Sequence, residues 1–501
     1  MIELTPIRPR RRAALAVALG AALLSAPAML ISEAPVFAQA RPTNLADLVD
    51  QVSDAVVNIS ATQTIDSKED SAAPGIPKGT PFDEMFEEFF KRHGGTPRPR
   101  SRQAQSLGSG FVVDQSGLVI TNNHVIGEAN DIVVIFNDGR RLKAKVVGKD
   151  PKVDVAVLKV ESDKPLKTVK FGDSDKIRVG DGVMAVGNPF GLGETVTAGI
   201  ISARNRNIDS GPYDDFLQTD ASINKGNSGG PLFNMAGEVI GINTAILSPS
   251  GGSIGIGFAT PSSTVVPIIA QLEKFHEVRR GWLGVRIQPV DDTIAESLGL
   301  PSAKGALVAG VDDKGPSKPA GIQAGDVIVK FDGKDIKESR DLPRLVAAMP
   351  VGQTVEVVVL RDGKEVTKSV TLGRLEDGEK VAALDNDKDK DKEGDVDREA
   401  RVAKTLGMQL STLDDDARKM FNIKEGARGV VVSAVDPGSA AAERGLRPGD
   451  IIQEVNHQAV DKPGQVAKAI EEAKKEGGKK PALLLVANAE GMARFVAIPL
   501  N

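Results

Sequence analysis

The sequence has no cysteine, and only four of its 501 residues are histidine. The absence of cysteine excludes disulfides, thiolate metal sites and a cysteine nucleophile. A mechanism that depends on an imidazole must therefore use His93, His124, His276 or His457.

Basic charge is not in excess either, because the formal net charge is −5. A chain with this balance has no broad positive surface for nucleic acid, so we predict no nucleic-acid partner. The sequence also lacks the phosphate-binding motif GxxxxGK[ST] and the zinc motif HExxH. We therefore expect neither ATP hydrolysis nor zinc catalysis, and predict no cofactor and no metal.

Only one apolar run is long, and it lies near the N-terminus. Arg8 and the arginines that follow precede an uncharged, mostly apolar stretch from Ala13 to Ser32, and Ala38-Gln39-Ala40 then gives an A-x-A cleavage pattern. This layout predicts a cleaved signal peptide over 1–40. The alternative is an uncleaved anchor, because about 20 apolar residues can span a bilayer. Pro27 and the A-x-A pattern favour cleavage.

The length allows about three domains at roughly 150 residues each. From 55 to 260 the pattern is one of short apolar strands separated by Gly, Asn and Asp turns, and Asn137-Asp138-Gly139 is a hairpin signal. Many such strands predict a β-barrel or β-sandwich domain. Apolar spacing predicts flanking helices over 44–54 and 262–278.

An insertion at about 66–105 interrupts the first strands. Within it, five apolar side chains fall on one helical face: Phe82, Met85, Phe86, Phe89 and Phe90. This face either folds back onto its own domain or contacts another subunit.

The C-terminal half contains an internal repeat. Residues 315–328 align without gaps to 439–452, at an offset of 124 residues, which predicts tandem domains. Between the copies, 385–399 holds eight acidic and four basic residues, which is typical of a flexible linker. A calcium loop would need Gly at its sixth and Glu at its twelfth position, and no frame supplies both. The predicted domains are 41–272, 273–375 and 401–501, with an acidic linker over 376–400.

Three motifs carry the candidate catalytic residues: Thr121-Asn-Asn-His-Val125, Val153-Asp-Val-Ala-Val-Leu158 and Asn224-Lys-Gly-Asn-Ser-Gly-Gly-Pro231. Ser228 lies in a glycine-rich turn, where backbone N–H groups can converge on one point. A serine nucleophile needs an imidazole to take its proton and a carboxylate to hold the imidazole tautomer. His124 and Asp154 are residues of these types, and the order His–Asp–Ser is a known triad order.

These motifs resemble those of trypsin-like serine proteases of the HtrA/DegP family, and the resemblance covers nearly the whole mature chain. It implies a mainly β fold, in which a trypsin-like double six-stranded β-barrel is followed by two α+β PDZ domains. It also implies that Ser228 is the nucleophile, His124 the general base and then acid, and Asp154 the residue that orients His124. The N–H groups of Gly226 and Ser228, on either side of Asn227, would form the oxyanion hole. The alternative is a pseudoenzyme that keeps only the shape.

Asn227 has no charge and cannot form an ion pair with a newly cut N-terminus. The resemblance therefore implies control by loop ordering. Arg206, in the segment 204–213, matches a basic residue of the family's sensing loop, although it is equally well explained as a solvated loop charge.

Ser222 stands where trypsin-like relatives place a charged pocket residue. Uncharged surroundings with Ile223, Ile254 and Ile256 predict a pocket for small aliphatic side chains such as Val or Ala. Core packing is the alternative explanation for these isoleucines.

The first repeat resembles a PDZ domain at its carboxylate-binding loop, which comprises Gly281, Trp282, Leu283, Gly284 and Val285. Such a loop holds a C-terminal carboxylate on backbone N–H groups, and the peptide adds as a strand to the sheet. The second repeat has the weaker match Thr405-Leu-Gly-Met408, so it either binds peptide or serves in assembly.

Together these features predict a periplasmic, ATP-independent serine endopeptidase that degrades misfolded or unfolded envelope proteins in quality control under stress. The predicted partners are unfolded chains and peptides with hydrophobic C-termini, with peripheral contact to the membrane. The resemblance implies a homotrimer or a multiple of trimers. The alternative function is a holding chaperone or peptide-binding scaffold in which proteolysis is secondary.

Overall fold

The computed structural model describes residues 44–64, 103–189, 193–224, 226–249, 252–385, 402–475 and 480–500. The predicted signal peptide and the apolar helical face of the insertion lie outside these residues. Among the helices of these ranges, none has the length and apolar character needed to cross a membrane.

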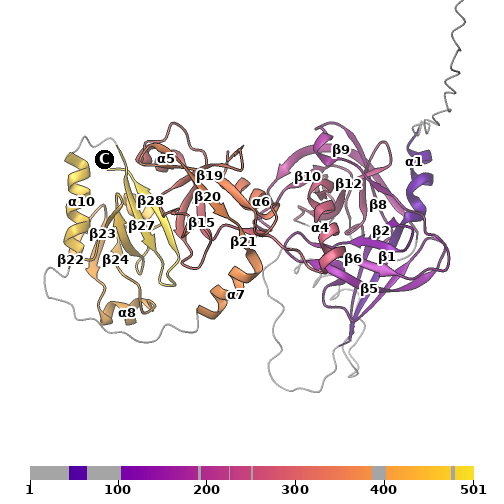
Figure 1. Ribbon diagram of the computed structural model, residues 1–501, viewed down its shortest axis with the longest axis horizontal. Helices are drawn as coiled ribbons and strands as arrows, with labels where there is room; N and C mark the ends of the chain where they lie inside the picture. Colours follow the sequence, from indigo (N-terminus) through magenta and orange to yellow (C-terminus); the bar gives the residue numbers. More distant parts are fainter. Residues whose placement is uncertain are drawn as a thin grey trace, which may run out of the picture. The chain divides into compact units, whose positions relative to one another are not determined.

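The first half of the predicted protease domain is a closed barrel of antiparallel strands in the order β1-β2-β3-β6-β5-β4 (Figure 1). Its strands are β1 (Val56–Thr64), β2 (Gln103–Asp114), β3 (Leu118–Thr121), β4 (Asp131–Ile135), β5 (Arg141–Asp150) and β6 (Val155–Val160). Strand β3 is buried along its whole length, as its unbroken apolar run predicts. The predicted Asn137–Gly139 hairpin joins β4 to β5, and Gly139 supplies the positive φ of the turn.

The second ring runs β11-β8-β9-β10-β13-β12 and closes through the pairing of β11 with β12, while β7 adds in parallel to β12. Its strands are β7 (Lys170–Phe171), β8 (Gly182–Gly187), β9 (Thr195–Arg206), β10 (Phe216–Thr219), β11 (Pro231–Asn234), β12 (Glu238–Ile246) and β13 (Gly257–Pro261). Phe111 and Met184, from different rings, are fully buried in one apolar cluster, so the two barrels share a core.

The described residues of this region also form four short helical segments, α1 (Leu45–Val52), η1 (Ser53–Ala55), α3 (Asn123–Ile126) and η2 (Ser174–Lys176). The longer α4 (Ser262–Phe275) packs against β5, β6 and β12. It ends before the predicted 278 because His276 adopts a left-handed conformation, with φ of 61°, that caps the helix. The predicted double six-stranded barrel is confirmed.

The first PDZ domain is a sheet in the order β15-β16-β17-β19-β20 with three helices. Its elements are β14 (Gly281–Trp282), β15 (Val285–Pro289), α5 (Asp292–Leu298), β16 (Ala306–Val311), β17 (Val327–Phe331), β18 (Lys334–Asp335), α6 (Asp341–Ala347), β19 (Thr354–Arg361), β20 (Lys364–Thr371), β21 (Gly373–Arg374) and α7 (Leu375–Asp385). Strand β14 pairs with β21, so β15 remains an edge strand of the main sheet.

The second PDZ domain repeats the order from β14 to β20, with a short additional helix, α9, between its third and fourth strands. Its elements are β22 (Val402–Thr405), β23 (Met408–Thr412), α8 (Asp415–Phe421), β24 (Val430–Val435), α9 (Ala440–Glu443), β25 (Ile451–Val455), β26 (Gln458–Ala459), α10 (Pro463–Lys475), β27 (Ala482–Ala487) and β28 (Ala493–Ile498). Strands β16 and β17 recur as β24 and β25 at the sequence offset of 124 residues.

The predicted linker over 376–400 needs one correction, because 376–385 belong to helix α7. The helix is anchored at its start, where the Leu375 N–H donates to the Arg280 carbonyl at 3.0 Å. The Trp282 ring lies so close to Gly378 that an added Cβ would be 2.8 Å from it. The acidic residues from 386 onward lie outside the described ranges.

Candidate active site

Strand pairing brings the predicted histidine and aspartate together. His124 lies on α3, directly after β3, and Asp154 immediately precedes β6; β3 and β6 are antiparallel neighbours. One oxygen of Asp154, Oδ2, lies 2.6 Å from His124 Nδ1. The other, Oδ1, accepts the backbone N–H of His124 at 2.8 Å. The carboxylate therefore holds both the ring and the backbone of the histidine.

Asp154 has φ of 59°, in the left-handed region that aspartate and asparagine tolerate better than most residues. Its carbonyl accepts a hydrogen bond from the side chain of Asn122 at 2.6 Å. Local strain of this kind is found where surrounding contacts fix a functional side chain.

The pKa of His124 reflects opposing effects of its surroundings. Burial lowers this pKa, but the negative charge of Asp154 and the hydrogen bond to Asp154 together raise it by more. The pKa of His124 is therefore raised above its ordinary value. An imidazole in this environment accepts a proton more readily than a free one does.

The Ser228 turn lies against strand β2 of the first barrel. The backbone N–H of Ser109, on β2, donates to the Ser228 carbonyl at 2.8 Å. A Cβ placed on Gly108 would lie 2.6 Å from the Val125 side chain and 3.1 Å from the Ser228 carbonyl oxygen. Only glycine therefore allows this close approach, which brings the serine turn next to the residue that follows His124.

The backbone of the turn has the form that the glycine pattern predicts. Gly226 has φ of 98° and Gly229 has φ of 83°, both in the region that favours glycine. The Asn227 N–H donates to the Asn224 carbonyl at 3.0 Å, and the Gly230 N–H donates to the Asn227 carbonyl at 2.9 Å. Ser228 itself is half-buried.

The predicted pocket isoleucines have three different surroundings. Ile223 is 2% exposed within the core of the second barrel, against Gly257. Ile256 packs against an apolar cluster that contains Phe216 and Phe258. Ile254 is 55% exposed. Core packing thus accounts for the apolar contacts of Ile223 and Ile256. The contribution of the three isoleucines to a substrate pocket stays a prediction.

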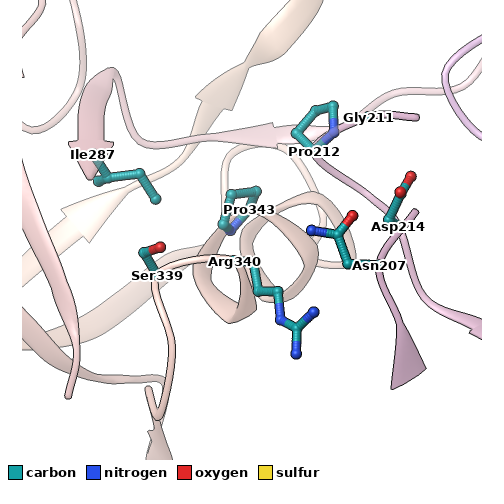
Figure 2. A pocket seen from close by; sticks show the side chains of 8 residues that line it. All are labelled: Asn207, Gly211, Pro212, Asp214, Ile287, Ser339, Arg340 and Pro343. Carbon is teal, nitrogen blue, oxygen red and sulfur yellow. The ribbon is translucent and has the colours of Figure 1, made fainter. Parts of the chain in front are cut away.

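Arg206 lies at the end of β9 and is exposed. Its Nε donates to the side chain of Gln218 on the neighbouring strand at 2.9 Å. The segment that follows lines a pocket with the first PDZ domain (Figure 2). The pocket is lined by Asn207, Gly211, Pro212, Asp214, Ile287, Ser339, Arg340 and Pro343. It is therefore separate from the predicted triad and lies where β15 and the start of α6 meet the protease domain.

The predicted carboxylate-binding loop connects β14 to β15. Leu283 is buried, and its carbonyl accepts the Ser317 N–H at 3.0 Å. Gly284 has φ of 72°, and an added Cβ would lie 2.7 Å from Gly315. The loop thus has the tight backbone that the motif predicts.

Three polar residues buried between the two barrels are not predicted from the sequence. Asn58, Ser109 and Asn188 are at most 2% exposed, and they hydrogen-bond around the serine turn. The sequence feature that could have identified them is a polar residue within an apolar strand, such as Asn58 in β1. The pair Arg280–Asp150, also buried, joins the first PDZ domain to the protease domain.

Comparison with known proteins gives a consistent picture. Residues 108–242 match the family of trypsin-like peptidase domains, and 281–372 and 431–476 match PDZ domain families. A probable periplasmic serine endoprotease of Brucella melitensis, described as DegP-like, is 44% identical and covers 98% of each chain. One from Rhizobium meliloti with the same description is 44% identical over 91% of this chain and 92% of its own. A solved HtrA-type protease, AlgW with a decapeptide, is 40% identical with a TM-score of 0.54 and covers 66% of this chain and 98% of its own.

Proposed function

Because the chain belongs to the DegP-like, HtrA-type family of serine endoproteases, we propose that it degrades unfolded envelope proteins in the periplasm without ATP. The observation that supports this most strongly is the two-point contact of Asp154 with His124 beside the Ser228 turn. The resemblance of 1–40 to a signal peptide supports export, and the family resemblance supports assembly into trimers or their multiples.

In the proposed reaction, the Ser228 hydroxyl attacks the substrate carbonyl and transfers its proton to Nε2 of His124. The Asp154 carboxylate keeps the proton of the neutral imidazole on Nδ1 and stabilises the imidazolium that forms. The N–H groups of Gly226 and Ser228 bind the oxyanion. His124 then protonates the leaving amine, and a water molecule, deprotonated by His124, cleaves the acyl-enzyme to release the carboxylic acid and restore the Ser228 hydroxyl.

The decisive experiment is cleavage of casein, an unfolded protein, by residues 41–501 in buffer without ATP. We expect peptide products, and we expect a fluorophosphonate to block cleavage and to label Ser228, as read by peptide mapping. Cleavage without label on Ser228 would contradict the assigned nucleophile. If casein stays intact while aggregation of an unfolded protein is suppressed, the holding chaperone becomes the better description.

The first PDZ domain is the proposed receptor for hydrophobic C-termini. Its strand β15 has an edge available for an added strand, and the carboxylate loop leads into it. Ile287 of β15 and Pro343 of α6 both line the pocket (Figure 2). A peptide strand added to β15 would bring its side chains to this pocket.

The corresponding edge of the second PDZ domain is covered by the chain itself. Strand β22 pairs antiparallel with β23 from Val402↔Ser411 to Thr405↔Met408, and it contacts helix α10. It therefore occupies the strand–helix groove where a peptide would add. The chain continues from β22 through the loop to β23, at the end where a peptide carboxylate would be held. This supports the assembly role rather than the peptide-binding role for this domain.

We predict one binding site per chain for a peptide with a hydrophobic, free C-terminus. Isothermal titration of the full-length protein should give a stoichiometry near one, and an amidated peptide should bind at least about 10-fold more weakly because the carboxylate contact is lost. Ile287→Gln should weaken binding, and Gln409→Ala on β23 should not. A stoichiometry near two, or equal effects of both variants, would contradict the assignment.

A further inference from the structure

Ser109 is fully buried at the junction of the two barrels, and its polar atoms bind both sides of the serine turn. Its N–H donates to the Ser228 carbonyl at 2.8 Å. Its hydroxyl donates to the Gly226 carbonyl at 2.5 Å. One residue of the first barrel thus holds the first and the last residue of the three that make up the proposed oxyanion hole.

A second bond to the hydroxyl fixes the direction of its proton. The backbone N–H of Asn188 donates to Ser109 Oγ at 2.8 Å. Because the hydroxyl oxygen accepts this bond, its own proton points to the Gly226 carbonyl. Asn188 is itself fixed, since its carbonyl accepts a bond from Asn58 at 2.8 Å. Its side chain donates to Asn137 at 2.6 Å.

Within the turn, the Gly226–Asn227 peptide is held by one backbone bond, from the Asn227 N–H to the Asn224 carbonyl at 3.0 Å. Gly226, with φ of 98°, is in a region where glycine is intrinsically free to move. Asn227 is 1% exposed, and neither polar atom of its side chain has a hydrogen-bond partner within the described part of the chain. The Asn227 side chain therefore does not anchor the turn, and the bond from Ser109 is a side-chain bond that reaches Gly226 directly.

We propose that Ser109 is a positioning residue for the oxyanion hole. By binding their carbonyl groups, Ser109 holds Gly226 and Ser228 in the orientation that stabilises the tetrahedral intermediate. The proposal rests on the proposed function, because it assumes that Ser228 is the nucleophile. Ser109 does not touch substrate. It acts by fixing the donors before substrate arrives, and preorganised donors are the ones that lower the barrier.

A purely structural role for this buried hydroxyl can be separated from positioning by a matched control. Ser262, 1% exposed at the start of α4, has the same bonding pattern. Its hydroxyl donates to the Gly172 carbonyl at 2.6 Å and accepts the Ser174 N–H at 3.1 Å. None of these bonds involves the residues of the predicted active site.

The experiment compares wild type, Ser109→Ala and Ser262→Ala, using the full-length protein and a small chromogenic peptide substrate. Both variants should lower the melting temperature to a similar extent. Only Ser109→Ala should lower kcat, by about 10- to 100-fold, somewhat less than the loss of an oxyanion donor itself. KM should change by less than about twofold, since the ground state does not use the hole. The inhibition constant of a peptide boronate should rise by the same factor by which kcat falls.

Ser109→Cys is measured in parallel, because it keeps the unbranched shape of the side chain and replaces the hydroxyl by a slightly larger, weak donor. An intermediate kcat is expected, and a wild-type kcat would overturn the proposal even if Ser109→Ala failed to fold. Equal kcat values for Ser109→Ala and Ser262→Ala would also overturn it. Ser228→Ala distinguishes failure of the proposed function from failure of the inference about Ser109. If Ser228→Ala still cleaves, the proposed function is wrong. If Ser228→Ala is inactive while Ser109→Ala behaves like Ser262→Ala, only this inference is wrong.

Discussion

Ser228→Ala is expected to lower kcat for peptide cleavage by about 10⁵- to 10⁶-fold, because the substitution removes the hydroxyl that would form the proposed acyl-enzyme. The substitution removes one hydroxyl from a half-buried side chain. The backbone contacts that hold the turn remain, including the bond from the Ser109 N–H to the Ser228 carbonyl. The melting temperature should therefore change little, and the first PDZ domain should still bind peptide with unchanged affinity.

Cleavage of a chromogenic peptide and of casein measures the first part of this prediction, and fluorescence anisotropy with a labelled C-terminal peptide measures the second. Ser262→Ala serves as a control for loss of a serine hydroxyl elsewhere in the domain. Residual cleavage within about 100-fold of wild type would show that another residue is the nucleophile. Loss of peptide binding together with activity would show that the variant is misfolded.

The barrels and the predicted triad could be read from the sequence because their signals are local. Each strand is a short apolar run bounded by turn residues, and His124, Asp154 and Ser228 each lie in a distinctive motif. Antiparallel pairing of β3 with β6 then brings His124 and Asp154 together. The repeat of 124 residues likewise predicted the second PDZ domain from the first.

What could not be predicted depends on contacts between distant parts of the chain. The residues from 376 to 385 have a polar, acidic composition that favours a linker, yet Arg280 and Trp282 anchor the start of a helix there. In the sequence, nothing distinguishes Ser109 from other polar residues of the strands. Its importance follows only from its bonds to Gly226 and Asn188, which are more than 75 residues away in the sequence.

The two PDZ domains also differ in a strand pairing that the sequence repeat does not predict. Their aligned segments recur as matching strands, such as β17 and β25. They differ at the strand before the predicted carboxylate loop, where β14 pairs with β21 but β22 pairs with β23. Pairing partners of an edge strand depend on tertiary contacts rather than on local pattern. The weak match at 405–408 was the only indication in the sequence.

Asp154→Asn should reduce kcat near neutral pH by about 10⁴-fold, by favouring the wrong imidazole tautomer. In the native protein, Oδ1 of Asp154 accepts the His124 backbone N–H, and Oδ2 faces Nδ1. An asparagine keeps its oxygen toward the backbone N–H, so its NH₂ group faces Nδ1. Nδ1 must then be the acceptor, the ring proton moves to Nε2, and Nε2 can no longer take the proton of Ser228. Asparagine also tolerates the left-handed backbone at this position, so the fold should persist.

The same substitution should shift the acid side of the pH–activity profile. The negative charge of Asp154 and the hydrogen bond to it raise the pKa of His124 against the effect of burial. Activity needs the neutral imidazole, so wild-type activity should fall, as the pH is lowered, at a pH above the ordinary histidine value. In Asp154→Asn the charge is gone and burial remains, so the pKa of His124 drops and the remaining activity should persist to lower pH.

Profiles of kcat/KM against pH for wild type and Asp154→Asn measure this shift, since they report ionisations of the free enzyme. Asp138→Asn is the matched control, because one oxygen of Asp138 accepts the Arg140 N–H at 3.0 Å and the other accepts Arg140 Nε at 2.6 Å. Asp138→Asn also removes one negative charge from a carboxylate whose two oxygens both accept hydrogen bonds, but this carboxylate lies on an exposed hairpin. The pH profile of Asp138→Asn should therefore match that of wild type. An acid limb that stays in place or moves to higher pH in Asp154→Asn would mean that Asp154 does not control the proton on His124.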